Sequence, residues 1–136
     1  MIFLFIEFIS IIIILNLINI NTIFIDEGQF FDDLVNIVRI LVENYKINVV
    51  VSGLDGDSNR NKFGHILDLI PLSNTCTKIN ASCIMCLDGT PAPFSFRKTN
   101  ENEQILIGAG DSYMSLCRKH YLENSFENSF ENSLDS

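Results

Sequence analysis

Two short spacings in the second half of the chain are suited to metal binding. Cys83 and Cys86 are separated by two residues, and Cys117 and His120 repeat that spacing. Thiolate and imidazole are preferred ligands of a tetrahedral zinc ion, and the two pairs together supply four of them. Four protein ligands leave no position for a substrate, so the predicted zinc is structural. The alternative is a set of ordinary thiols and a surface histidine, and we expect the remaining thiol, Cys76, to be buried.

A second group of reactive side chains follows an apolar run near residue 25. This run ends abruptly at Asp26 and Glu27. It predicts a strand buried on both faces of a parallel sheet, and ligands of open α/β sheets bind beyond the carboxyl ends of such strands. Here one carboxylate can hold Mg²⁺ through water and another can act as a general base. The alternative is a solvated acidic turn.

The elements that position these acids form a predicted strand–helix–strand unit. We expect a strand over 22–26, a helix over 33–45 from its apolar spacing, and a second buried strand at 49–51. Short connections between them imply a parallel sheet with a right-handed crossover. A short helix over 65–70 should end at Pro71, and His65 within it is expected to have no role in a site.

The pattern changes at residue 76 to short strands and turns. Strands are predicted at 77–82, around Phe94 and Phe96, and at 105–107, followed by a helix over 113–121 that carries two of the metal ligands. From Glu123 a four-residue repeat of Glu-Asn-Ser-Phe type begins, which is acidic and of low complexity. We expect this tail to be disordered.

Composition limits the kinds of partner and compartment. The 136 residues allow one modest core, and the net charge of -8 with scattered basic residues argues against nucleic-acid binding. Cysteine spacings of the metal type indicate a reducing, cytoplasmic compartment. Residues 1–20 are almost entirely apolar but interrupted by Glu7. They leave three interpretations open: low-complexity sequence foreign to the domain, a membrane or signal segment, or a core element.

Five sequence blocks follow one another along the chain: Asp-Glu-Gly-Gln-Phe-Phe at 26–31; Gly-Leu-Asp-Gly at 53–56 with Phe63-Gly64 and 66–72; Cys83-x-x-Cys86; Ile107-Gly108 followed by Tyr113; and Cys117-Arg118-x-His120-Tyr121. In this order they resemble the carboxyl-terminal two-thirds of a thymidine kinase of the zinc-containing cellular and poxvirus type, type II. The resemblance covers residues 22–122. We therefore expect an apolar segment (1–21), a partial kinase α/β core (22–75), a zinc-binding lasso (76–122) and the acidic tail (123–136).

The resemblance implies a role for each of these residues. Glu27 would take the proton from the thymidine 5′-hydroxyl, and Asp26 would help to position the Mg²⁺ that accompanies ATP. The zinc would anchor the lasso, Ser95 and Arg97 match polar positions within it, and the chain would form a homo-oligomer. The thymine pocket would be formed by Phe30, Leu54, Phe63 and Tyr113, with the backbone of Ile107 and Gly108 contacting the base edge.

Two departures from the family pattern qualify these expectations. The loop 57–62 lacks the aromatic residue and the proline that often precede Phe-Gly in the family. The family also begins with a Gly-x-x-x-x-Gly-Lys-Ser/Thr phosphate loop, whereas residues 1–21 contain no glycine and no lysine. We therefore expect an α/β fold with a partial P-loop-type parallel sheet and a zinc-bound β lasso, carrying thymidine kinase chemistry without its ATP cradle. The alternative is a non-catalytic, zinc-stabilised binding or assembly module derived from such a kinase.

Overall fold

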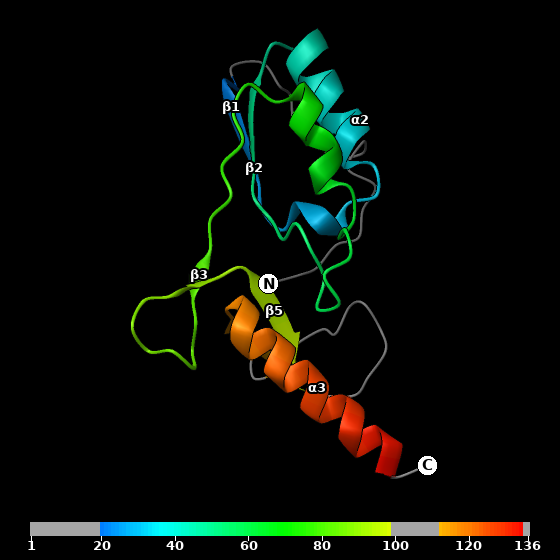
Figure 1. Cartoon of the computed structure of the whole chain (residues 1–136). Helices are drawn as coiled ribbons and strands as arrows, with labels where there is room; N and C mark the ends of the chain where they lie inside the picture. Colours follow the sequence, from blue (N-terminus) through cyan, green and yellow to red (C-terminus); the bar gives the residue numbers. More distant parts are fainter. Residues whose placement is uncertain (1–19, 99–111, 135–136) are drawn as a thin grey trace. The chain divides into compact units, whose positions relative to one another are not determined.

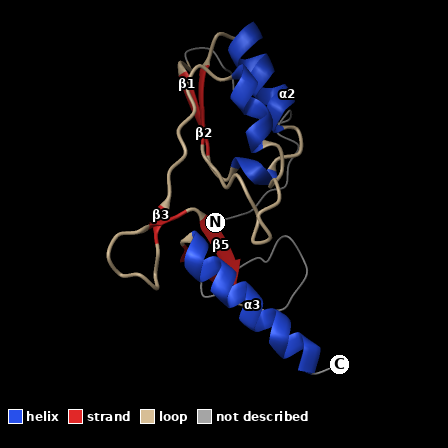
Figure 2. Ribbon diagram, viewed as in Figure 1, coloured by secondary structure: helices blue, strands red, loops and turns tan. Residues whose placement is uncertain are grey.

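The computed structural model describes residues 20–98 and 112–134, which belong to two compact units (Figure 1). The first unit contains residues 20–55 and 62–76, and the second contains residues 56–61, 77–98 and 112–134. Figure 2 shows that each unit combines helices and strands. Among the described residues there is one parallel pair of strands and there are two antiparallel pairs.

The first unit is built on the predicted strand–helix–strand sequence. Strand β1 (Thr22–Ile25) pairs in parallel with β2 (Asn48–Val51), in a register that places Ile25 opposite Val51. Between them lie a short 3₁₀ turn, η1 (Gly28–Phe30), the helix α2 (Leu34–Arg39) and its π-helical continuation η2 (Ile40–Asn44). The parallel pairing and the helix are confirmed. A further 3₁₀ segment, η3 (Ile66–Leu72), continues past the expected end at Pro71.

The core of the first unit lies on one face of the two strands. Figure 1 shows α2 and η3 on the same side of β1 and β2, where Ile25, Leu34 and Leu69 are buried together. The other face is uncovered, with Phe24 77% and Val50 49% exposed. The prediction of strands buried on both faces is therefore wrong for the described residues, because successive side chains point to opposite faces and these helices cover only one.

The second unit contains two short antiparallel pairs and one helix. β3 (Ala81–Ser82) pairs with β4 (Pro91–Ala92), and β5 (Phe94–Arg97) pairs with β6 (Tyr113–Leu116). Its helix α3 (Arg118–Leu134) follows at once. The strand around Phe94 is confirmed, the strand predicted at 77–82 is reduced to two residues, and the one at 105–107 lies outside the described residues. The buried core of this unit consists of Cys83, Ala92, Phe96, Leu116 and Tyr121.

Three predictions about the second half are wrong. Residues 113–116 form a strand rather than the start of a helix, because pairing with β5 satisfies their backbone groups. The segment 123–134 is helical rather than disordered: its four-residue repeat is close to the 3.6-residue helical period, and the Asn124 and Ser125 side chains bond to carbonyls one turn earlier. Cys76, expected to be buried, is exposed.

The apolar start of the chain is described only from Ile20 onward. Within the described segments, no helix is both long enough and apolar enough to cross a membrane.

Candidate functional site

The two candidate acids, Asp26 and Glu27, lie just beyond the carboxyl end of β1. Oδ1 of Asp26 accepts hydrogen bonds from the Ser52 hydroxyl at 2.7 Å and from the Glu27 backbone N–H at 3.0 Å. Ser52 follows β2 directly, so the parallel register places it beside Asp26. The Ser52 hydrogen bond, followed by that of Glu27, lowers the pKa of Asp26 below its ordinary value. The lowered pKa keeps Asp26 ionised to a lower pH than an ordinary aspartate.

Glu27 has a backbone conformation that is unusual for a residue with a side chain. Its φ of 52° and ψ of 43° lie in the left-handed region, immediately before η1. Conformations of this kind are costly for non-glycine residues and occur often at functional sites. The next residue, Gly28, donates its N–H to the Ser52 carbonyl at 2.9 Å, and the Glu27 carboxylate accepts a 2.6 Å hydrogen bond from the Gln29 side chain. Backbone and side-chain contacts thus hold the carboxylate in place.

Three of the predicted pocket residues accompany the acids in the first unit. The rings of Phe30 and Phe63 meet edge to face, with centroids 5.5 Å apart. Leu54 is 46% exposed, and its backbone N–H donates to Gln29 Oε1 at 3.0 Å. The unit therefore combines two partly exposed apolar side chains, Phe30 and Leu54, and the buried Phe63 with a fixed carboxylate. This combination is suited to a small neutral ring beside a reactive hydroxyl.

The other predicted substrate residues are not in this unit. Tyr113 belongs to β6 of the second unit, where its hydroxyl accepts a hydrogen bond from Arg97 Nε at 3.1 Å. Ser95 lies on the neighbouring strand β5, opposite Ser115. Ile107 and Gly108 lie outside the described residues.

Sequence reasoning missed two residues beside the acids. Gln29 lies within the Asp-Glu-Gly-Gln block, but its spacing gave no indication that its side chain would be buried. Ser52 could have been found, because a residue that follows β2 stands next to the residue that follows β1 once the parallel register is assumed.

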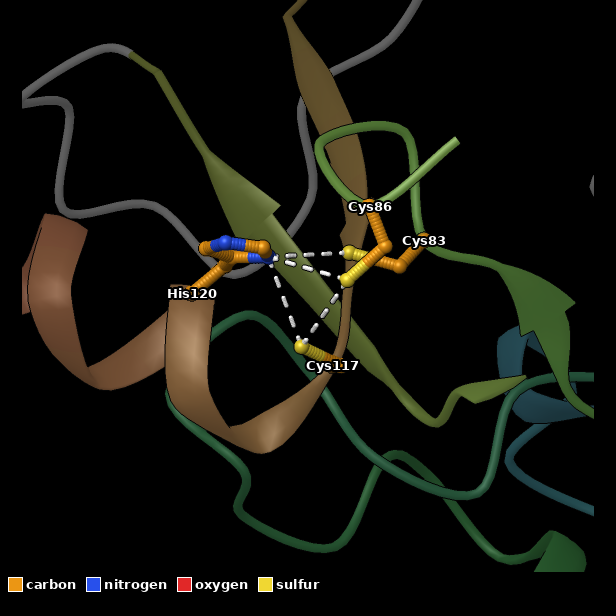
Figure 3. Close-up of side chains that lie close together, drawn as sticks. All are labelled: Cys83, Cys86, Cys117 and His120. Carbon is orange, nitrogen blue, oxygen red and sulfur yellow. Dashed lines mark hydrogen bonds between the residues drawn. The ribbon is translucent and has the colours of Figure 1, made fainter. Parts of the chain in front are cut away.

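The four predicted metal ligands meet at one point in the second unit (Figure 3). Nδ1 of His120 lies 3.3 Å from the sulfur of Cys83 and 3.4 Å from those of Cys86 and Cys117. The sulfurs of Cys86 and Cys117 are 3.9 Å apart. A tetrahedral zinc ion would separate its sulfur ligands by about 3.8 Å and a sulfur from a nitrogen by about 3.6 Å. The donor set therefore fits a four-coordinate zinc ion with no open position.

Two structural junctions bring these ligands together. Cys83 and Cys86 stand in a turn after β3, where the Cys83 N–H donates to the Thr90 carbonyl at 2.8 Å. Cys117 links β6 to α3, and His120 lies in the first turn of that helix. Two residues separate the members of each pair, and a tight turn or a helical turn is short enough to direct both toward one centre.

The thiols of the cluster differ in their affinity for protons. Burial opposes ionisation of Cys83, but hydrogen bonds from the Cys117 backbone, the His120 ring and the turn N–H groups outweigh it and lower the pKa to about 5. Burial raises the pKa of Cys86 to about 11; the Thr90 hydroxyl opposes this shift, and the neighbouring Cys83 and Cys117 thiols add to it. The cluster thus holds one ready thiolate and one thiol that must lose its proton to bind a metal.

Comparison with known proteins shows which family of proteins this chain is similar to. The family model described as thymidine kinase matches residues 5–121. A thymidine kinase of Oryza sativa subsp. japonica is 49% identical over 76% of this chain, and thymidine kinase a of Arabidopsis thaliana is 44% identical over 74%. The thymidine kinase of vaccinia virus (strain Western Reserve) is 44% identical over 74%. The chain spans 38%, 41% and 55% of the length of these three relatives, respectively.

Proposed function

Because the chain belongs to the thymidine kinase family, we propose that its first unit carries the acceptor side of a thymidine kinase. In that reaction the γ-phosphate of ATP is transferred to the 5′-hydroxyl of deoxythymidine, in the salvage of DNA precursors. The observation that carries the proposal is the fixed Glu27 carboxylate at the end of β1, in the same unit as Phe30, Leu54 and Phe63. The pocket side chains would hold the base while the carboxylate acts on the sugar.

The proposed chemistry assigns separate tasks to the two acids. Glu27 accepts the proton of the 5′-hydroxyl as that oxygen forms a bond to the γ-phosphorus and the bond from this phosphorus to the bridging oxygen of ADP breaks. Asp26, held as a carboxylate by Ser52, is the residue that would position Mg²⁺. When bound with ATP, Mg²⁺ would neutralise the charge on the phosphate oxygens.

The residues proposed to recognise the base in the first unit are apolar. A neutral pyrimidine is held by apolar faces and a few backbone hydrogen bonds rather than by charge. Phe30, Leu54 and Phe63 supply apolar faces in the first unit, and family resemblance adds Tyr113 and the backbone of Ile107 and Gly108. The zinc ion on the four-residue cluster would hold the turn after β3 to the start of α3.

The donor side of the reaction has no counterpart in this sequence. It contains no Gly-x-x-x-x-Gly-Lys-Ser/Thr stretch to cradle the ATP phosphates. We therefore propose that this chain binds deoxythymidine but does not phosphorylate it alone. The second candidate is a zinc-stabilised binding or assembly module that does not transfer phosphate. The homo-oligomer and the cytoplasmic location stay predictions.

Calorimetry with the purified, zinc-loaded chain tests the proposal. Deoxythymidine should bind, and Glu27→Gln should weaken binding by up to about tenfold because a neutral amide is a poorer acceptor for the 5′-hydroxyl. The exposed Glu43→Gln in η2 is a matched control that should bind like the unmodified chain. Absence of deoxythymidine binding by the unmodified chain would refute the acceptor-site assignment.

A phosphorylation assay tests whether this chain transfers phosphate without a partner. The chain is incubated with ATP, Mg²⁺ and deoxythymidine, and thymidine monophosphate is measured. We expect none from this chain alone, since the phosphates have no cradle. Turnover near that of a complete kinase would contradict the acceptor-only assignment and the binding-module alternative alike.

A further inference from the structure

The Gln29 side chain uses both ends of its amide in the first unit. Its Nε2 donates to the Glu27 carboxylate at 2.6 Å, and its Oε1 accepts the Leu54 backbone N–H at 3.0 Å. The residue is only 3% exposed. Because a carboxylate only accepts and a backbone N–H only donates, the chemistry of these partners allows one orientation of the amide. The buried Gln29 amide therefore contacts both Glu27, the candidate general base, and Leu54, a candidate pocket residue.

Two glycines lie close against Gln29. A Cβ atom on Gly53 would lie 2.3 Å from the Gln29 Oε1 atom. A Cβ on Gly64 would lie 2.0 Å from the Gln29 carbonyl oxygen, and Gly64 has a φ of +54° that itself favours glycine. The side-chain end and the backbone of Gln29 are thus both packed against positions where no side chain fits.

We propose that Gln29 is a positioning residue that ties the Glu27 carboxylate to the nucleobase pocket at Leu54. The inference rests on the proposed function and assigns a task to a residue outside the predicted site. A general base must reach the reacting proton when the substrate is seated. The distance between the pocket wall and the carboxylate must therefore be held constant, and a buried amide with a charge-assisted hydrogen bond at one end can do this.

Two substitutions of Gln29 by side chains of similar length distinguish its hydrogen bond to Glu27 from its hydrogen bond to Leu54. Gln29→Met removes both hydrogen bonds. Gln29→Glu keeps an oxygen to accept the Leu54 N–H but replaces the amide donor to Glu27 by a second carboxyl group. The exposed Asn36→Asp in α2 makes the same amide-to-carboxylate change away from the site and serves as the control. Thermal unfolding of each variant shows whether the fold is kept.

The binding readout compares deoxythymidine with 5′-deoxythymidine, which lacks the reacting hydroxyl. Gln29→Glu should lower the preference for deoxythymidine by about tenfold while affinity for 5′-deoxythymidine changes by less than about threefold. Gln29→Met should weaken the binding of both nucleosides, and Asn36→Asp should weaken the binding of neither. If Gln29 only stabilised the fold, Gln29→Glu would change the affinity for both nucleosides equally. An unchanged preference for deoxythymidine over 5′-deoxythymidine in Gln29→Glu therefore overturns the inference.

If the variants fail to fold, hydrogen exchange in the unmodified chain tests the same two hydrogen bonds of the Gln29 amide. The Gln29 side-chain amide protons should exchange at least about tenfold more slowly than those of exposed Asn36, and deoxythymidine should slow them further. Equal exchange of the two amides overturns the inference while leaving the proposed function intact. If the unmodified chain binds neither nucleoside, the proposed function fails first and the positioning role fails with it.

Discussion

Zinc binding to the four-residue cluster should release a proton from Cys86. At neutral pH, Cys83, with a pKa of about 5, is already a thiolate, whereas Cys86, with a pKa of about 11, is still a thiol. Zinc binds the thiolate, so the metal and the Cys86 proton compete. Lower pH favours the proton, and the apparent zinc affinity must therefore rise with pH. One released proton corresponds to an increase of about tenfold per pH unit, at any pH below the pKa of Cys86.

The assay is competition for zinc against a chromophoric chelator of known affinity, repeated between about pH 6 and 8. The unmodified chain should bind one zinc ion, with an affinity that rises at least about tenfold per pH unit. Cys86→Ser should bind zinc more weakly, and its pH dependence should be shallower by the one proton that is no longer released. Cys76→Ser is the matched control, because Cys76 is exposed and lies outside the cluster.

Three outcomes would contradict this prediction. An affinity independent of pH would mean that Cys86 is already ionised or is not a ligand. Equal pH dependence in Cys86→Ser and the unmodified chain would show that the released proton comes from another group. A zinc content near zero in freshly folded protein would remove the structural role assigned to the metal altogether.

Two further predictions concern the first unit. Ser52→Ala should raise the pKa of Asp26 toward its ordinary 3.8, because the Ser52 hydrogen bond favours the carboxylate. This hydrogen bond stabilises the folded chain above pH 3.8, and the stabilisation is lost as the pH falls through the lowered pKa of Asp26. A ¹³C titration of Asp26 with the same midpoint in Ser52→Ala and in the unmodified chain would contradict the prediction. Gly64→Ala should destabilise its unit by about 2–4 kcal/mol in urea unfolding, since strain at positive φ adds to a clash with the Gln29 carbonyl. Gly89→Ala, at positive φ with open space around it, should cost only about 1–2 kcal/mol, and equal losses would exclude the clash as the cause.

Features that depend on local pattern could be predicted from the sequence. The apolar run before Asp26, the helical spacing from Leu34 to Leu41 and the three valines at 49–51 predict the parallel strand–helix–strand unit correctly. The two-residue spacings within the metal-ligand pairs also select the four side chains that the structure brings together. Both signals are strong because short-range geometry alone limits what these residues can do.

Features that depend on pairing partners required the tertiary structure. The segment Tyr113–Leu116 is a strand because β5 lies beside it, a long-range partner that helical spacing does not reveal. The exposed face at Phe24 and Val50 results from helices that cover one side of β1 and β2. Local sequence carries no record of which neighbour will satisfy a backbone group or cover a face.

The same distinction applies to the candidate site. The sequence by itself determined which residues have reactive side chains: the acids after β1 and the thiols and imidazole of the cluster. Only the tertiary structure decided that Ser52 holds Asp26 and that Gln29 joins Glu27 to Leu54. The reason is physical, because chemical type is a property of each side chain, whereas burial and hydrogen-bond partners are properties of the packed chain.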